Sequence, residues 1–460
     1  MSWARIMAPL SGGAGDAAAV AAAVMLAEPF QAEMTGVYTP ADVADVIEAA
    51  AYPAFVPTDI PQVATRGGPV LALPKVYPIY FASDDPTVTA QVTDFVSKVG
   101  ATPYWNTVAG EYGVGSLVAE TPIQLTAADN PPALYTDTQI ENWLDAKLGD
   151  GADGGTGAPD PAFPTPDGNT IFAFFFPSGV TISQGGGGAP PGDGGASDAA
   201  APTGSLSCTS FGGYHSAFTM NNNTNVAYAV IPRCANFDGF TGIDAVTAAA
   251  SHELLEGTTD PYLDAFSSTD SAHRYWATVV GGGGEIGDMC AQTLSSFTHF
   301  PELPAYLVQR CWSNKTALTG GDPCVPVPPG EVYFNTIPVM PDVLQVMGRG
   351  ADGGTSTVPT KGVQIAVGAS KTIELDLFSN VPTSEDWNIT AYDSNTLNQL
   401  TPALLDFSFD KSHGHNGDKI QMTIKVLAAG RRNTEAFMIV STLGTSQTSP
   451  QNIWAGEVGN

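Results

Sequence analysis

One short segment of this sequence carries residue types that could hold a metal ion. In residues 241–261, TGIDAVTAAASHELLEGTTDP, His252 and Glu256 are four positions apart, so on a helix their side chains lie one turn apart on one face. Imidazole nitrogen and carboxylate oxygen are both ligands of divalent cations such as zinc. The rest of that face is small and leaves room for an ion or a substrate: Ala245, Ala248 and Ala249.

Glu253 follows His252 directly and could act as a general base. Zinc peptidases with a helical His-Glu-x-x-His use the two histidines as zinc ligands and the glutamate to take a proton from water. In this sequence Glu256 stands where that motif has its second histidine. The carboxylate lowers the net positive charge of the ion, so water bound to it would be less acidic. The substitution therefore leaves open Mn²⁺ or Ca²⁺ beside zinc, and a weaker catalyst.

A second segment could supply the third ligand. Residues 281–290 read GGGGEIGDMC, and Glu285 and Asp288 are three positions apart, so on one helical turn both would face the same way. We expect one of them to complete the site. Asp260 and His215 are lesser candidates, and His215 could instead act as an electrophile or proton donor across a cleft.

The alternative is that these residues have only structural roles. A short His-Glu-x-x-Glu string arises by chance in long chains, Glu256 could cap the helix or form a salt bridge, and His252 could be a half-buried histidine. The remaining histidines have no comparable neighbours and are predicted to lie at the surface: His273, His299, His413 and His415.

The composition excludes some classes of function. The 460 residues include 46 Asp and Glu against 17 Lys and Arg, a formal net charge of −29. Such a chain repels nucleic acid and anionic membrane surfaces and attracts cations, although solubility alone also explains the charge. No run of 18 apolar residues is present, so we predict no transmembrane helix. Residues 17–26 are apolar but make a poor signal peptide.

The cysteines fall in the same region as the candidate site. None of them forms a CxxC pair, which argues against a zinc ribbon or a thioredoxin-type motif. Their confinement to one region predicts one or two disulfides, one cysteine left over, and an oxidising compartment. The alternative is a set of buried thiols in a cytosolic protein. The five are Cys208, Cys234, Cys290, Cys311 and Cys324.

The pattern around the site predicts an α/β scaffold. Residues 76–83 should form a strand and residues 86–100 an amphipathic helix. A further helix is predicted at 140–149, and a long strand or strand pair at 170–182. The glycine-rich insert at 183–205 is predicted to be disordered.

The helix that carries the site should have one apolar face and should end at Gly257, since glycine commonly ends helices. Glu253 is expected on a flank between the two faces. The residues expected to pack in the core are Ile243, Val246, Ala250 and Leu254.

The two ends of the chain differ from this middle part. Residues 1–45 read as strand, helix and strand and resemble the start of universal stress proteins, but no counterpart of that family's glycine-rich nucleotide-binding segment follows, so no ATP site is expected. Residues 46–75 read as a linker. After a rigid exit linker at 323–329, alternating polar and apolar runs over 335–460 predict an immunoglobulin-like β-sandwich.

Several blocks together resemble the EXORDIUM, or phosphate-induced protein, family over about residues 74–324. The resemblance implies secretion and a cell-surface or wall-associated role, and it implies no particular reaction or substrate. Where plant members tend to have Asn, this chain has Asp260, which puts a ligand role for Asp260 in doubt. The blocks are FGGYHSAF (211–218), VAYAVIPRC (226–234), SHELLEGTTDPYLD (251–264), Trp276, GGEIGDMC (283–290) and YLVQRCW (306–312).

The sequence therefore predicts an α+β protein, with a zincin-like metal-binding domain at 76–324 followed by an immunoglobulin-like β-sandwich at 335–460. The first functional hypothesis is a secreted, monomeric zinc-dependent hydrolase of peptidase type acting on a polypeptide or cell-envelope substrate. In it Glu253 is the base, and His252, Glu256 and Glu285 or Asp288 hold the metal. The second is a non-catalytic extracellular binding protein with a structural metal. A cytosolic nucleotide-binding stress protein is a distant third.

Overall fold

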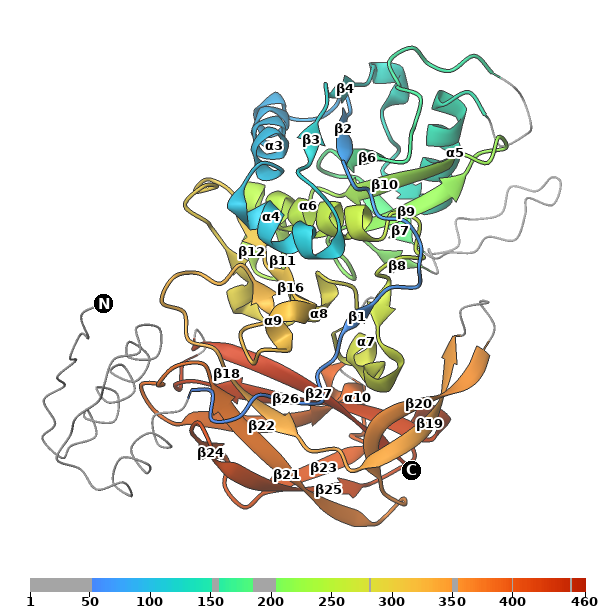
Figure 1. The fold of residues 1–460 in the computed structure, drawn as a ribbon. Helices are drawn as coiled ribbons and strands as arrows, with labels where there is room; N and C mark the ends of the chain where they lie inside the picture. The colour runs from blue at the N-terminus through green and yellow to red at the C-terminus, as the bar shows by residue number, and fades with distance from the viewer. Residues whose placement is uncertain are drawn as a thin grey trace, which may run out of the picture.

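The computed structural model describes residues 52–150, 157–184, 204–280, 283–349, 355–398, 400–446 and 449–460. The predicted strand–helix–strand at 1–45 and residues 185–203 of the predicted insert lie outside these ranges. The described chain mixes helices and strands, as predicted for an α+β protein. Figure 1 shows an α/β part at the top, two β-sheets at the bottom, and a region of short helices and strands between them.

A mixed sheet forms the centre of the α/β part. Its inner strands are parallel, and one edge strand, β9, runs antiparallel to its neighbour β10. The predicted strand at 76–83 is present but shorter. In spatial order the strands are β3 (Val118–Ala119), β2 (Lys75–Tyr80), β6 (Thr170–Phe175), β10 (Asn225–Ile231) and β9 (Tyr214–Thr219), with β4 (Ile123–Gln124) also pairing with β2.

Helices cover both faces of this sheet because successive residues of its strands point to opposite sides. Ile171, Ala173 and Phe175 of β6 belong to the core beneath one set of helices, whereas Phe172 and Phe174 belong to the core beneath another. The first set is α3 (Pro86–Val99), α4 (Pro103–Ala109) and α6 (Gly242–Thr259), and the second is α5 (Asp137–Lys147).

The helix ends follow local capping chemistry. The Asp85 side chain accepts a hydrogen bond from the Thr87 N–H and Pro86 opens α3, which is the helix predicted at 86–100. The helix predicted at 140–149 begins three residues earlier, because Thr136 and Gln139 form a capping box before Ile140.

The prediction that Gly257 ends the site helix is wrong, because α6 continues to Thr259. This glycine serves close packing instead: a Cβ there would lie 2.7 Å from the Ile171 Cδ1 atom and 3.3 Å from the His215 Cβ atom. The two extra residues bring Asp260 to the C-cap, where its N–H donates to the Glu256 carbonyl.

Short elements complete the α/β part and the region below it. The predicted apolar stretch at 170–182 forms two strands, β6 and β7, which belong to different sheets. Strands β5 (Leu134–Thr136), β7 (Thr181–Gln184) and β8 (Ser205–Leu206) form a three-stranded sheet. The other short strands of the described residues form pairs: β1 (Val63–Ala64) with β13 (Ser268–Thr269), β11 (Asn236–Phe237) with β12 (Phe240–Thr241), β14 (Phe297–Thr298) with β15 (Val308–Gln309), and β16 (Cys311–Trp312) with β17 (Cys324–Val325). Short helices are α7 (Tyr275–Val280), α8 (Asp288–Ala291) and α9 (Asn314–Ala317), with 3₁₀ turns at Gly110–Tyr112, Ala127–Asp129, Ser271–His273 and Leu294–Ser296.

Two expected linkers are part of the packed structure where it is described. Residues 52–75 bury Ile60 and Leu71, and β1 within them pairs with β13. The expected exit linker at 323–329 contains β17, which pairs with β16. The composition of these segments predicted linkers, but both contribute apolar side chains to the core.

The C-terminal part consists of two sheets with a shared core. Ring contacts join them, since Phe334 lies 5.3 Å from Trp387 and Phe407 lies 5.7 Å from Phe437. One sheet has the order β18 (Phe334–Pro338), β21 (Ser370–Ser379), β25 (Lys419–Val426) and β23 (Leu405–Phe409). The other has the order β19 (Asp342–Arg349), β20 (Thr355–Gln364), β27 (Gln451–Gly459), β26 (Thr434–Thr442), β22 (Trp387–Asp393) and β24 (His413–Gly414), with α10 at Ser394–Leu397 and a 3₁₀ turn at Arg431–Asn433.

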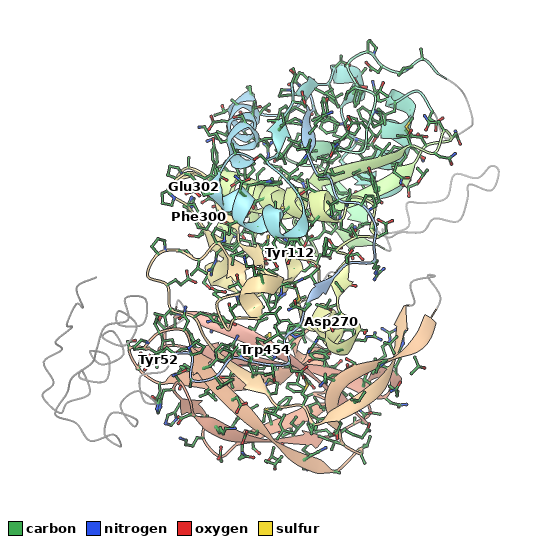
Figure 2. The ribbon with its side chains drawn as sticks, in the orientation of Figure 1. Tyr52, Tyr112, Asp270, Phe300, Glu302 and Trp454 are labelled. Atoms are coloured by element: carbon green, nitrogen blue, oxygen red, sulfur yellow. A yellow bond between two sulfur atoms is a disulfide. The ribbon has the colours of Figure 1, made fainter. Side chains whose placement is uncertain are left out.

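The two parts meet through buried aromatic side chains. Trp276 of α7 packs between Trp312, at 5.8 Å, and Trp454 of β27, at 5.3 Å between ring centroids. Figure 2 labels Trp454 and Asp270 on the two sides of this boundary. Because all three tryptophans are almost fully buried, the upper and lower parts share one continuous core.

Two disulfides join Cys208 to Cys234 and Cys290 to Cys324, and Cys311 is free and buried. This confirms the prediction of one or two disulfides with one cysteine left over. Among the described residues, no helix is both long and apolar enough to cross a membrane.

Candidate metal centre

The candidate site lies on the face of α6 that the sequence predicted to be open. Ala245, Ala248 and Ala249 line a pocket of about 620 Å³ together with His252 and Glu256. The opposite face packs in the core through Val246, Ala250 and Leu254. Glu253, expected on a flank, also lines the pocket and is 5% exposed.

His252 is held in one orientation by a residue that the sequence analysis did not single out. Its Nδ1 lies 2.9 Å from the Gln309 Oε1 atom, while the Gln309 Nε2 atom donates to the Gly287 carbonyl at 2.6 Å. Because the Gln309 Oε1 atom can only accept a hydrogen bond, the His252 Nδ1 atom carries the hydrogen and donates it. The Nε2 atom of the neutral ring then presents its lone pair to the pocket, as a metal ligand requires.

Glu256 divides its two carboxylate oxygens between structure and site. Its Oε1 accepts hydrogen bonds from the backbone N–H groups of Gly287 at 2.8 Å and Asp288 at 3.0 Å. Its Oε2 lies 2.9 Å from the His252 Nε2 atom. The backbone therefore fixes the carboxylate and leaves one oxygen facing the imidazole.

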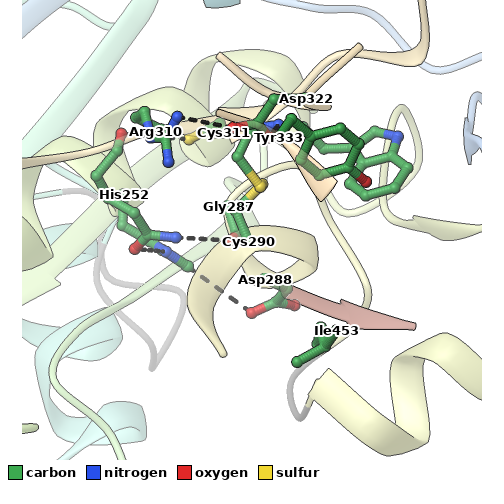
Figure 3. The surroundings of a disulfide bond; sticks show 12 residues. His252, Gly287, Asp288, Cys290, Arg310, Cys311, Asp322, Tyr333 and Ile453 are labelled. Carbon is green, nitrogen blue, oxygen red and sulfur yellow. Dashed lines mark hydrogen bonds and ion pairs between the residues drawn. A yellow bond between two sulfur atoms is a disulfide. The ribbon is translucent and has the colours of Figure 1, made fainter. Parts of the chain in front are cut away.

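The carboxylate of Asp288, like that of Glu256, is held through one oxygen by backbone N–H groups. Its Oδ2 accepts from the N–H groups of Gly283 at 2.7 Å and Gly284 at 2.9 Å, which belong to the glycine run before it. Its Oδ1 lies 3.9 Å from the His252 Nε2 atom. Figure 3 shows His252, Gly287 and Asp288 beside the disulfide of Cys290, which ties the short helix α8 to β17.

These three side chains fit the demands of a small divalent cation. His252, Glu256 and Asp288 offer ligand atoms that all lie within 4.8 Å of one another. Zinc binds such atoms at about 2.0–2.2 Å, so two ligands of a tetrahedral ion lie roughly 3.4 Å apart. The separations of 2.9 Å and 3.9 Å from the His252 Nε2 atom lie on either side of that value.

His215 faces this group from the sheet. On the edge strand β9 it pairs with Ala229, whose side chain points toward α6, so the His215 ring leaves the sheet on the same side. Its Nδ1 lies 3.7 Å from the Glu253 Oε2 atom and 3.9 Å from the Glu256 Oε2 atom. The structure thus brings His215 across the pocket from α6.

Glu285 and Asp288 do not face the same way, contrary to the prediction. The chain from Gly283 to Gly287 is a loop, and α8 begins only at Asp288, so helical spacing does not apply to the pair. Asp288 points toward His252, whereas the Glu285 Oε2 atom lies 3.5 Å from the His215 Nε2 atom. Glu285 therefore belongs to a neighbouring group with His215 and Asp260.

Burial and the many carboxylates of the pocket shift the pKa values of its ionisable side chains. Burial alone would lower the pKa of His252, but the nearby carboxylates, chiefly Glu256, outweigh it and hold this pKa well above its usual value. Burial raises the pKa of Asp288 to about 7, and the charge of Glu256 adds to that rise. Burial also raises the pKa of Glu285 well above its ordinary range. Carboxylates held this close together repel one another, and a nearby positive charge favours their ionised form.

Two glycines leave the space that the site side chains occupy. A Cβ at Gly287 would lie 2.6 Å from the His252 Nδ1 atom, and one at Gly213 would lie 2.8 Å from the Glu253 Cγ atom. Both glycines lie in the blocks that carry the EXORDIUM resemblance, and Gln309 lies in the YLVQRCW block. Their positions in these blocks were the one feature of the sequence that could have pointed to Gly213, Gly287 and Gln309. No rule of residue spacing connects these residues to His252.

The other histidines lie outside the pocket, but one of them is not at the surface. His273 is 5% exposed, and its Nδ1 lies 3.0 Å from the Asp270 Oδ1 atom. The surface prediction is wrong for His273 because Asp270 and Asp59 neutralise its charge where the two parts of the chain meet. His299, His413 and His415 are exposed as predicted.

Comparison with known proteins gives little to add to this geometry. No protein-family model and no curated protein matches the sequence. Among solved structures, the chain is similar to S-layer protein SbsC domains 4 and 5, with 15% identity and a TM-score of 0.15, covering 33% of this chain and 89% of that one. It is also similar to SbsC domains 1–6, with 16% identity and a TM-score of 0.15, covering 33% and 22%. TM-scores this low carry no argument about the fold or the function.

Proposed function

We propose that this protein is a metal-dependent hydrolase of peptidase type, with His252, Glu256 and Asp288 as its metal ligands. One observation carries the proposal: each ligand has one polar atom fixed by the surrounding chain and another directed at a common point. Gln309 fixes His252, and backbone N–H groups fix the two carboxylates. Such supporting contacts are typical of metal ligands, since they set the tautomer and the orientation.

Two further polar side chains of the pocket, Glu253 and His215, suit the other roles in hydrolysis. A divalent cation held by the three ligands would supply Lewis acidity toward a substrate carbonyl and toward water. Glu253 would take the proton from the attacking water, and its side chain is buried at the pocket wall. The His215 Nδ1–H, across the pocket, would donate a hydrogen bond to the developing oxyanion, and Glu253 would pass the proton taken from water to the leaving amine.

The pocket suits a polypeptide with an apolar side chain. Beside the polar floor its wall includes Phe211, Phe237, Phe240 and Phe297, and the rings of Phe240 and Phe297 lie 4.8 Å apart. Apolar walls with a few convergent polar groups are typical of small-ligand and substrate sites. A protein or cell-envelope peptide is therefore the proposed substrate class.

The proposed fold and setting extend the sequence hypothesis. A sheet with an antiparallel edge strand over a His-Glu helix supports a zincin-like α/β part, and the two C-terminal sheets support an immunoglobulin-like accessory domain. The segments that resemble the EXORDIUM family are those that build the site. Two disulfides fit an oxidising compartment and hence a secreted or cell-surface protein.

A second candidate function is a non-catalytic binding protein with a structural metal. One observation favours it: the segment from Glu285 to Asp288 follows α7, and α7 packs on the C-terminal sheets through Trp276 and Trp454. A cation held by Asp288 would then stiffen the connection between the two parts, and binding rather than hydrolysis would be the activity.

Two substitutions separate these functions. In Glu253→Gln, we expect zinc content to stay at the wild-type level and cleavage of a peptide library to fall at least about 100-fold, because only the base is lost. In His252→Ala, both zinc and cleavage should be lost. Glu385→Gln, an exposed substitution on the C-terminal part, is the matched control and should change neither. A wild-type protein that binds zinc, unfolds at lower temperature with a chelator and cleaves no peptide would support the binding function instead.

A further inference from the structure

Three buried polar atoms beside the proposed metal centre have no hydrogen-bond partner in the described structure. They are the His215 Nε2, the Asp260 Oδ2 and the Glu285 Oε2 atoms. Asp260 is fully buried, and the side chains of His215 and Glu285 are 6% and 13% exposed. Buried polar groups are almost always paired, so three orphan atoms in one place require an explanation.

The three atoms come from separate segments that converge on one point. His215 lies on the edge strand β9, Asp260 caps the end of α6, and Glu285 lies in the loop before α8. The three residues offer ligand atoms within 4.8 Å of one another, and the His215 Nε2 lies 3.5 Å from the Glu285 Oε2. Asp260 accepts the Ala265 N–H at 2.7 Å with its Oδ1 atom, so Oδ2 is the oxygen without a partner in the described structure.

Hydrogen bonding among the three residues does not satisfy them. Two carboxylates can only accept when ionised, and one ring nitrogen offers them at most one proton. Within the described residues, the cationic groups beside the pocket carboxylates are the imidazoles of His215 and His252. Among the residues that the structure describes, no other positive charge lies beside Asp260 and Glu285.

The charge of the whole pocket leads to the same conclusion. Five carboxylates face two imidazoles; with all five ionised and both rings neutral, one divalent cation at His252 leaves an excess of three negative charges. A second divalent cation reduces that excess to one. The five are Glu253, Glu256, Asp260, Glu285 and Asp288.

We propose that His215, Asp260 and Glu285 hold a second divalent cation beside the first. One imidazole nitrogen with two carboxylates suits a borderline ion such as Zn²⁺ or Mn²⁺. Mg²⁺ is a poorer match, since it prefers oxygen ligands to an imidazole nitrogen. The second position shares no ligand with the set of His252, Glu256 and Asp288, so it does not depend on the function proposed for that set.

A cation at this position would also fix the state of His215. With the Nε2 atom bound to the ion, the ring must carry its proton on Nδ1. The Nδ1 atom is the one that lies 3.7 Å from the Glu253 Oε2 and 3.9 Å from the Glu256 Oε2. The second ion thereby holds a hydrogen-bond donor toward the pocket, where the proposed hydrolysis needs one for the oxyanion.

The number of ions bound per chain tests this inference. The full-length protein is stripped with a chelator and reloaded with Zn²⁺, and in parallel with Mn²⁺, and bound metal is measured by native mass spectrometry. We expect two ions in the wild-type protein and one in Asp260→Asn and in Glu285→Gln. Asn at 260 keeps an oxygen for the Ala265 N–H, and thermal unfolding checks that both variants are folded. Asp264→Asn, an exposed neighbour, is the matched control and should keep two ions.

The same measurement separates this inference from the proposed function. His252→Ala should lose one ion and keep the other. A wild-type protein with a single ion that Asp260→Asn and Glu285→Gln both retain would overturn the second site and leave the first. A single ion that survives His252→Ala but not Asp260→Asn would support the second site and overturn the first. Two ions in every variant would overturn the assignment of both sets.

Discussion

Two regions of this molecule place buried histidines against carboxylates, and they differ in charge balance. At the boundary with the C-terminal sheets, His273 lies 3.0 Å from Asp270 and 3.3 Å from Asp59, and Lys361 lies 3.5 Å from Asp59. Two cationic groups there face two carboxylates. Among the described residues of the pocket, two imidazoles face five carboxylates.

The balance of cationic groups and carboxylates distinguishes a structural ion pair from a metal site. The boundary group is neutral overall: Asp270 also accepts the N–H groups of Gln62 and Ala272, and the His273 Nε2 faces the Asp59 carboxylate at 3.3 Å. The pocket group is complete only with added cations. The same residue types therefore have different roles, and their count decides which.

The largest expected effect comes from filling the space beside His252. Gly287→Ala would place a Cβ 2.6 Å from the His252 Nδ1 and 2.9 Å from the Glu256 Oε1, so the imidazole and the carboxylate must both move. We expect zinc affinity to fall at least about 100-fold, or roughly 2.7 kcal/mol, as measured by isothermal titration calorimetry. Gly110→Ala is the control, because a Cβ there meets nothing within 4 Å. An unchanged affinity in Gly287→Ala would mean that these side chains do not hold the ion.

The boundary group should respond to pH and not to metal. Burial would lower the pKa of His273, but Asp270 and Asp59 outweigh it and raise this pKa to about 9. Because the folded-state pKa exceeds the unfolded value of about 6.5, the stabilisation is complete below pH about 6.5 and is lost as the pH rises through about 9. Asp59 is partly exposed, which reduces the size of the effect to roughly 2 kcal/mol.

Urea unfolding at a series of pH values from about 6 to 10 measures this loss. His273→Gln should flatten the pH dependence, and the exposed His415→Gln is the control and should leave it unchanged. A free energy of unfolding that does not change across that range in the wild-type protein would show that His273 is not a charged partner of the two aspartates.

Gln309 should have the smallest of these effects, because it acts on the metal only through His252. In Gln309→Leu the His252 Nδ1 loses its acceptor, and the Gly287 carbonyl loses its donor. We expect about a tenfold loss of zinc affinity. Gln309→Glu restores an acceptor for the imidazole and should recover most of the affinity. Equal losses in both variants would indicate disturbed packing rather than lost orientation.

The sequence predicted what depends on local periodicity. The spacing of His252 and Glu256 within an apolar pattern placed both on one helical face, with the alanines around the pocket. Apolar spacing likewise located α3, and the helix predicted at 140–149 is α5, which begins three residues earlier. These features follow from the geometry of one helix, so a single sequence contains them.

What the sequence could not predict depends on contacts between distant segments. Gln309 reaches His252 across 57 positions, and Gly257 is a close-packing residue because β6 and β9 lie against it. Glu285 and Asp288 were expected to act together, but a loop turns them toward different histidines. The role of His273 depended on Asp59, from a segment that read as a linker.

The most direct test of the account compares zinc binding in three proteins: wild type, His252→Ala and His273→Ala. The account predicts that His252→Ala lowers zinc affinity at the first site at least about 100-fold. It predicts that His273→Ala binds zinc as the wild type does, although its free energy of unfolding is lower. Equal zinc binding in all three proteins, or equal losses in the two variants, would contradict the claim that the pocket, and not the boundary group, is the metal centre.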